Sequence, residues 1–255
     1  MSIMAPAADK KLTGLVAATF TPITSQGMDQ VIVHVGCLSL KDTQELAHHA
    51  AQIEADGIAV IAPSFFKPSS ADVLRTFLQE VASAAPTLPF YYYHVPSVTG
   101  VNVNVRELIE GIEKVIPSFR GVKFTGSDLM DLGQCISYIP PHWSVLYGID
   151  EQLLGALVMG VHGAVGSTYN YVGCHVNKLI SAFETGDLVQ ARTIQFKIQE
   201  LVSFAIKLGF DVGVNKQLMN ELSGLDLGPP RLPVMTCPAA RALAIKQKYD
   251  SIFPE

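Results

Sequence analysis

The sequence predicts an α/β fold in which parallel strands and helices alternate, arranged as a (β/α) barrel. Short runs that are apolar on both faces alternate with segments of helical periodicity, and the loops between them are short. Strands covered by helices on both faces have this continuous apolar character. The 255 residues, 49% hydrophobic and 16% charged, can bury one large core, so we expect a single domain over 1–255.

Seven apolar runs are predicted to be strands. They lie at 14–20, 31–36, 57–63, 89–95, 121–125, 144–149 and 163–169. Helices are predicted at 41–56, 71–86, 104–115, 187–210 and 238–250, so the chain from about 171 to 255 is expected to be a helical C-terminal extension. Seven strands with short connections favour a barrel over an open sheet.

The connection between the first two strands departs from this rhythm. Residues 21–30 contain no helical pattern, whereas a parallel crossover usually needs a dozen residues or more and a helix. An eight-stranded barrel needs one more strand than the seven predicted. We therefore predict that one strand is missing here; the alternative is that the run at 31–36 pairs differently.

Composition excludes several classes of protein. The net charge is −5 and the basic residues are scattered, so neither nucleic acid nor a membrane surface is an expected partner. No apolar run reaches transmembrane length, and the first residues lack the apolar core of a signal peptide. Four widely spaced cysteines favour a reducing, cytoplasmic compartment over a disulfide framework or a zinc site.

Lys123 is the first candidate for chemistry, because lysine is rarely buried unless it is paired or reactive. Alternation along the strand puts Gly121, Lys123 and Thr125 on one face. Val122 and Phe124 would then meet the helices, and Lys123 would point into the barrel near the carboxyl end of its strand. A dry site favours the neutral amine, which can form a Schiff base with a ketone. The alternative is a lysine that reaches the rim or pairs with a carboxylate.

Tyr93 is the second candidate. It shares a strand face with Tyr91 and lies nearer the carboxyl end. A tyrosine hydroxyl can act as an acid or base when a neighbouring cation stabilises the phenolate. The alternative is an aromatic core residue with a satisfied hydroxyl.

Two adjacent carboxylates follow the sixth predicted strand. Gly148 and Asp150 share a face at its end, and Asp150 and Glu151 open the next helix. Such carboxylates could accept hydrogen bonds from sugar hydroxyls, or they could simply cap the helix and complement its dipole. The glycine-rich stretch at 160–170 could cradle a phosphate, but it has no phosphate-loop motif.

Several segments together are similar to one known family. They are 14–22, 91–101, 121–129, 147–160 and 163–171. They resemble the N-acetylneuraminate lyase branch, and the animal sequences in particular, of the Schiff-base lyases related to dihydrodipicolinate synthase. The resemblance implies a (β/α)8 TIM barrel of the class I aldolase type, a homotetramer, a lysine Schiff base, and neither a metal nor another cofactor.

The resemblance also implies roles for individual residues. Lys123 would be the Schiff-base lysine and Tyr93 the catalytic hydroxyl. The pocket for the sugar part of the substrate would be lined by Thr125, Gly148, Asp150, Glu151 and Ser167.

Two positions distinguish this chain within the family. Sequences that resemble dihydrodipicolinate synthase have an arginine in the P-S-x-T-G motif where this chain has Val98, which favours the sialate branch. The family's G-[ST]-T-G-E motif, which holds the substrate carboxylate, is absent. The resemblance thus implies that one strand and two helices are missing after the first strand.

The implied activity is the reversible cleavage of N-acetylneuraminic acid (sialic acid) to N-acetylmannosamine and pyruvate in sialic acid catabolism, impaired by the missing motif. Two alternatives stay open at this point. One is a non-catalytic shortened isoform that exchanges into full-length tetramers. The other is a Schiff-base aldolase for another 2-keto acid.

Overall fold

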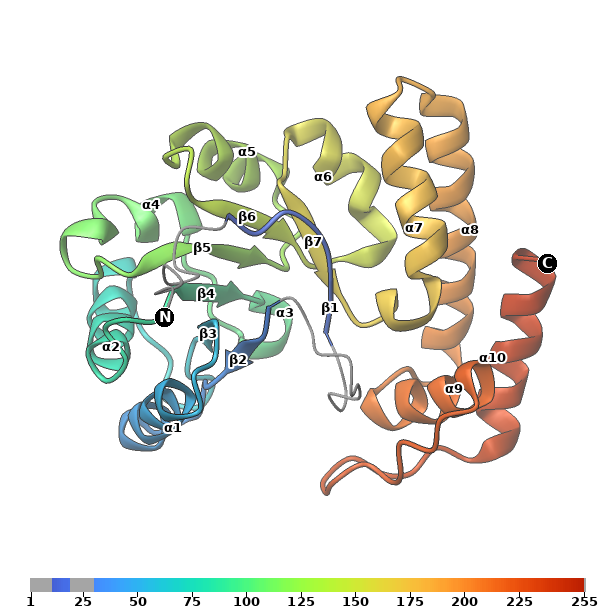
Figure 1. Cartoon of the computed structure of the whole chain (residues 1–255), viewed down its shortest axis with the longest axis horizontal. Coiled ribbons are helices and arrows are strands. Elements are labelled where there is room, and N and C mark those ends of the chain that lie inside the picture. The colour runs from blue at the N-terminus through green and yellow to red at the C-terminus, as the bar shows by residue number, and fades with distance from the viewer. Residues whose placement is uncertain (1–10, 19–29, 255) are drawn as a thin grey trace, which may run out of the picture. The chain divides into compact units, whose positions relative to one another are not determined.

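A computed structural model describes residues 11–18 and 30–254, which form an α/β fold on a seven-stranded sheet (Figure 1). The strands are β1 Gly14–Ala17, β2 Ile32–His34, β3 Gly57–Ile61, β4 Phe90–His94, β5 Phe119–Phe124, β6 Ser144–Tyr147 and β7 Gly163–Gly166. Each described strand lies within or close to a predicted apolar run. Their order in the sheet is β1-β7-β6-β5-β4-β3-β2.

Helices connect the strands and form the C-terminal part. The α-helices are α1 Leu40–Gln52, α2 Ala71–Ser83, α3 Pro96–Thr99, α4 Val105–Ile109, α5 Leu129–Tyr138, α6 Leu153–Met159, α7 Tyr169–Glu184, α8 Leu188–Lys207, α9 Val212–Ser223 and α10 Ala239–Ile252. The 3₁₀ turns among the described residues are η2 Ile112–Lys114 and η3 Asp150–Gln152. Within the described ranges, no helix combines the length and apolar character that a membrane crossing requires.

The chain groups into two compact units. The first takes in the described residues of Met1–Gly14, Thr24–Gly148 and Val158–Ala164, and the second those of Leu15–Ile23, Ile149–Leu157 and Val165–Glu255. In the second unit α7 packs on α8, and α10 packs on α8 and α9. The single domain expected from the sequence stays a prediction.

The sheet order bears directly on the predicted missing strand. β2 pairs with β3 in parallel, from Ile32 opposite Gly57 to His34 opposite Ala59, so the alternative that this run pairs differently is wrong. β1 and β2 stand at opposite ends of the sheet order. A complete eight-stranded barrel would hold one more strand between them, so the fold is a partial barrel, as predicted. The link itself, residues 19–29, lies outside the described residues.

Helices cover one face of the sheet in the first unit. Tyr92, Val122 and Phe124 on this face are almost completely buried. Burial, together with the negative charge of Asp131 on α5, raises the pKa of the Tyr92 hydroxyl. The side chains of Lys123 and its alternating neighbours therefore lie on the opposite face, as the strand pattern predicts.

Two predicted boundaries are wrong. The helix predicted at 104–115 is two pieces, because Glu110 leaves the helical conformation and Gly111 adopts a left-handed one with φ of 66° before η2 begins. The strand predicted at 163–169 ends at Gly166, because Thr168 is the N-cap of α7.

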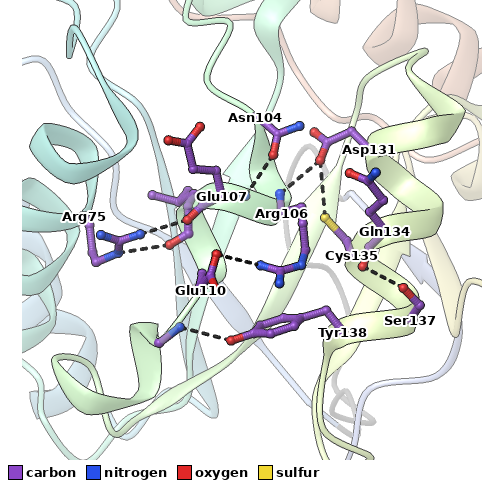
Figure 2. Close-up of polar contacts among 12 residues, drawn as sticks. Arg75, Asn104, Arg106, Glu107, Glu110, Asp131, Gln134, Cys135, Ser137 and Tyr138 are labelled. Carbon is purple, nitrogen blue, oxygen red and sulfur yellow. Dashed lines mark hydrogen bonds and ion pairs between the residues drawn. The ribbon is translucent and has the colours of Figure 1, made fainter.

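The short helix α4 depends on its neighbours, as Figure 2 shows. Arg75 of α2 donates to the carbonyl oxygens of Glu107 (2.8 Å) and Leu108 (3.1 Å) in α4. The buried carboxylate of Asp131 accepts from the first two backbone N–H groups of α4, at 2.9 and 3.0 Å. A helix of this length is not stable alone, so these contacts stabilise the connection between β4 and β5.

We predict that Asp131→Ala lowers the free energy of unfolding by about 2–6 kcal/mol, because two N–H groups at the start of α4 lose their acceptor at about 1–3 kcal/mol each. Chemical denaturation of the purified chain measures this. Asp128→Ala is the control, since Asp128 is an exposed N-cap of α5 and its loss should cost about 1 kcal/mol. Equal losses for the two variants would contradict the prediction.

Candidate active site

The pairing of β4 with β5 brings Tyr93 and Lys123 together. Tyr93 stands opposite Lys123 in the parallel register, so the two side chains share a face. The Lys123 Nζ lies 4.0 Å from the centroid of the Tyr93 ring, within cation–π range. Both side chains are half-buried. An amine and a phenol in this arrangement have the chemistry of a nucleophile beside an acid/base group.

An irregularity in the ladder sets this pairing. Phe90 is opposite Phe119, but Tyr91 is opposite Gly121, so β5 has one extra residue between these pairs. Such a bulge changes which side chains meet downstream of it. Without it, Tyr93 would stand opposite Val122, and Lys123 would have a different partner.

Gly148 makes room for the site at the end of β6. Its N–H donates to the Phe124 carbonyl at 2.8 Å, which holds it against β5. A Cβ at this position would lie 1.8 Å from Thr125 Oγ1 and 3.2 Å from Lys123 Cε. The absence of a side chain is therefore required for Thr125 and Lys123 to occupy their positions.

The Thr125 hydroxyl is a buried polar group beside Lys123. Its Oγ1 is buried and has no hydrogen-bond partner among the residues that the structure describes. A buried hydroxyl in this state costs about 1–3 kcal/mol relative to a paired one. A buried polar group of this kind calls for a partner.

His34 lies next to this group and was not predicted as a site residue. Its ring meets the Tyr93 ring edge-on, with centroids 6.0 Å apart at 88°. Desolvation of the ring against its neighbours, and secondarily the positive charge of Lys123, lower the pKa of His34. The sequence contains no local signal for this contact, because it joins β2 to β4 across another strand.

Asp150 has a structural role in the second unit. Its Oδ2 accepts from the backbone N–H (3.1 Å) and the hydroxyl (2.5 Å) of Thr168, at the start of α7. Its backbone carbonyl accepts from Gln195 Nε2 of α8 at 3.3 Å. Asp150 thus holds the residue that precedes α7, whereas neither η3 nor α7 has a side-chain cap hydrogen bond, so the helix-capping alternative is not supported.

Glu151 and Ser167 also belong to the second unit. Desolvation raises the pKa of the half-buried Glu151 carboxyl; the nearby charge of Asp150 adds to this rise, and a backbone hydrogen bond opposes it. The Ser167 carbonyl accepts from Asn170 Nδ2 at 2.7 Å. The predicted site residues thus divide between the units, with Tyr93, Lys123, Thr125 and Gly148 in the first.

No metal site is evident in the described part of the chain. Over residues 11–18 and 30–254, no group of three or more histidine, cysteine, aspartate or glutamate side chains is arranged to hold a metal ion.

The partial (β/α) barrel and its lysine–tyrosine pair define a class of protein, and a known family matches this chain. The dihydrodipicolinate synthetase family matches residues 15–249, so this chain belongs to that family.

Curated relatives identify the branch. The N-acetylneuraminate lyase of Danio rerio is 51% identical over 297 positions, which cover 95% of this chain and 97% of the relative. That of Mus musculus is 56% identical over 208 residues, covering 81% of this chain and 65% of the relative. The first alignment is longer than the 255 residues of this chain, so the fish protein has residues without a counterpart here.

Solved structures agree with the fold. The N-acetylneuraminate lyase (sialic acid aldolase) of Aliivibrio salmonicida superposes with a TM-score of 0.87 at 32% identity, covering 95% of this chain and 97% of that chain. A catalytic-lysine mutant of the Ruminococcus gnavus sialic acid aldolase gives 0.80 at 28% identity, covering 88% and 72%.

Gly148→Ala should destabilise the chain by about 1–3 kcal/mol, because the added methyl group overlaps the Thr125 hydroxyl. Gly155→Ala is the matched control: it lies in α6 with open space around it, and alanine should stabilise the helix by about 0.5–1 kcal/mol. Denaturation curves measure both. A Gly148 variant as stable as the native chain would contradict the close approach.

Thr168→Val should destabilise the second unit by about 1.5–3 kcal/mol, because it removes the charge-assisted hydrogen bond from the hydroxyl to Asp150. Thr185→Val is the control, since this hydroxyl bonds only carbonyl oxygens at the exposed end of α7. The midpoint of thermal unfolding reports the difference. Similar midpoints for the two variants would argue against a structural role for Asp150.

Proposed function

We propose that this chain is a Schiff-base lyase that cleaves N-acetylneuraminic acid to N-acetylmannosamine and pyruvate, with Lys123 as nucleophile and Tyr93 as acid/base. The observation that carries the proposal is the position of the Lys123 amine, 4.0 Å from the Tyr93 ring centroid on the face opposite the helices. The catalytic lysine of the Ruminococcus gnavus relative and the identity to animal lyases support it.

The first step captures the substrate ketone. The Lys123 nitrogen lone pair attacks the ketone carbon of the open-chain sugar, and water leaves as the carbon–nitrogen double bond forms. The protonated imine then withdraws electrons from the adjacent carbon–carbon bonds. The Thr125 hydroxyl, buried and without a partner among the described residues, is available to hold a polar group of the bound sugar.

The second step breaks the carbon–carbon bond. Tyr93, acting through the substrate carboxylate, accepts the proton of the hydroxyl two carbons from the imine carbon. As this oxygen becomes an aldehyde, the bond breaks and its electrons form an enamine on Lys123. Protonation of the enamine carbon and hydrolysis by water release pyruvate and restore the amine. Acid/base groups of this kind contribute about 10²–10⁴-fold.

Three further residues are assigned by the resemblance alone. Asp150, Glu151 and Ser167 are proposed to bind the sugar part of the substrate. Because the Asp150 side chain also bonds Thr168, its contribution would include holding the start of α7 in place.

We further propose that this shortened chain is less active than full-length relatives. Without the carboxylate-binding motif, several charge-assisted hydrogen bonds are lost, each contributing about 1.5–3 kcal/mol. A homotetramer in the cytoplasm is also proposed, on the family resemblance. Light scattering after size-exclusion chromatography tests the tetramer.

The test of the proposed function is reductive trapping. We expect borohydride with pyruvate to add one reduced pyruvate per chain, and peptide mass spectrometry to locate it on Lys123. Lys123→Met should abolish the adduct, whereas Lys67→Met, at an exposed lysine, should not. Tyr93→Phe should retain the adduct and lower lyase turnover by about 10²–10⁴-fold.

Two outcomes would contradict the proposal. Native chain that folds but acquires no adduct would rule out the Schiff base. An adduct spread over surface lysines, unchanged in Lys123→Met, would show that the reaction is not specific to the site.

A further inference from the structure

The imidazole of His34 has no role in the mechanism above, although it faces the same side of the sheet as Lys123. His34 stands opposite Ala59 of β3, and Ala59 stands opposite Tyr91 of β4. Partners in a parallel ladder share a face, and residues two apart along a strand share it too. His34 is therefore on the face that carries Tyr93 and Lys123.

The His34 ring leans toward the carboxyl end of β2. Tyr93 and Lys123 lie near the carboxyl ends of their own strands, β4 and β5. A Cβ at Gly36 would lie 3.0 Å from His34 Cε1, the carbon between the two ring nitrogens. Glycine at position 36 therefore leaves the imidazole more room than a larger residue would. The small side chain of Ala59 lets the imidazole reach across β3 to the Tyr93 ring.

The imidazole is accessible and has spare hydrogen-bonding capacity. His34 is exposed, and the structure gives its ring nitrogens no hydrogen bond to any residue of 11–18 or 30–254. Both causes that lower its pKa, desolvation and then the charge of Lys123, favour the neutral ring at pH 7. A neutral imidazole offers one N–H donor to an anion.

A 2-keto acid bound to Lys123 places an anion near this donor. The carboxylate is attached to the imine carbon, one bond from the nitrogen that was Lys123 Nζ. Lys123 Nζ and the His34 ring both contact the Tyr93 ring, so their separation cannot exceed the sum of those two distances. The carboxylate and one hydrogen bond reach about 6 Å from the imine nitrogen, so the proposed bond requires a ring nitrogen of His34 within that distance.

We propose that His34 donates a hydrogen bond to the carboxylate of the 2-keto acid that Lys123 holds as an imine. The inference rests on the proposed function and adds a substrate-binding residue to it. His34 would thereby select keto acids over neutral ketones, because only the acid gains a charge-assisted bond.

The test compares two ketones that differ in the carboxylate. Borohydride trapping is measured by intact mass against the concentration of pyruvate and, separately, of acetone. His34→Leu keeps an apolar contact with Tyr93 and removes the donor. We expect the half-saturating pyruvate concentration to rise about 10–150-fold, as loss of one such bond predicts, with acetone trapping unchanged. His34→Gln should recover part of the pyruvate affinity.

His49→Leu is the matched control, because His49 is an exposed histidine on α1 whose ring makes no contact with the site. Equal losses for pyruvate and acetone in His34→Leu would overturn the inference and indicate a packing role through Tyr93. Unchanged pyruvate trapping would overturn it as well. If the native chain traps neither ketone, the proposed function fails first, and the inference fails with it.

Discussion

The register between β4 and β5 is the constraint on which the candidate site depends. It places Tyr93 opposite Lys123, and it does so only because β5 has an extra residue upstream. Side chains alternate with a period of two, so a shift of one residue would turn the lysine toward the helix-covered face. There the ammonium would meet the buried aromatic surface formed by Tyr92 and Phe124. The pairing therefore determines both the location of the amine and its surroundings.

The open end of the sheet, at β2, is the second feature that bears on the candidate site. A closed barrel has no edge, whereas the sheet described here ends at β2. His34 belongs to this last strand, which explains how its ring can touch Tyr93 and still be exposed. The missing strand therefore leaves β2, with His34, at the open end of the sheet.

Local sequence patterns predicted the strands and their faces well. Alternation alone assigned Lys123 and Tyr93 to their faces, and the short link after the first strand indicated a missing strand. Such patterns do not specify which residues pair across neighbouring strands. The bulge in β5 and the contact of His34 with Tyr93 could therefore not be predicted. The break at Gly111 was missed because the apolar periodicity continues through it while the backbone does not. The hydrogen bonds from Thr168 to Asp150 link residues 18 apart, which a local pattern cannot detect.

Tyr93 and Lys123 lie on the neighbouring strands β4 and β5, and Gly148, which makes room for Lys123 and Thr125, directly follows β6. The shortened link lies well upstream of these residues. The residues proposed to capture the ketone and the segment whose absence leaves the barrel open therefore lie in different stretches of the chain. A deletion at the link leaves the stretch that carries the proposed catalytic pair unchanged in sequence.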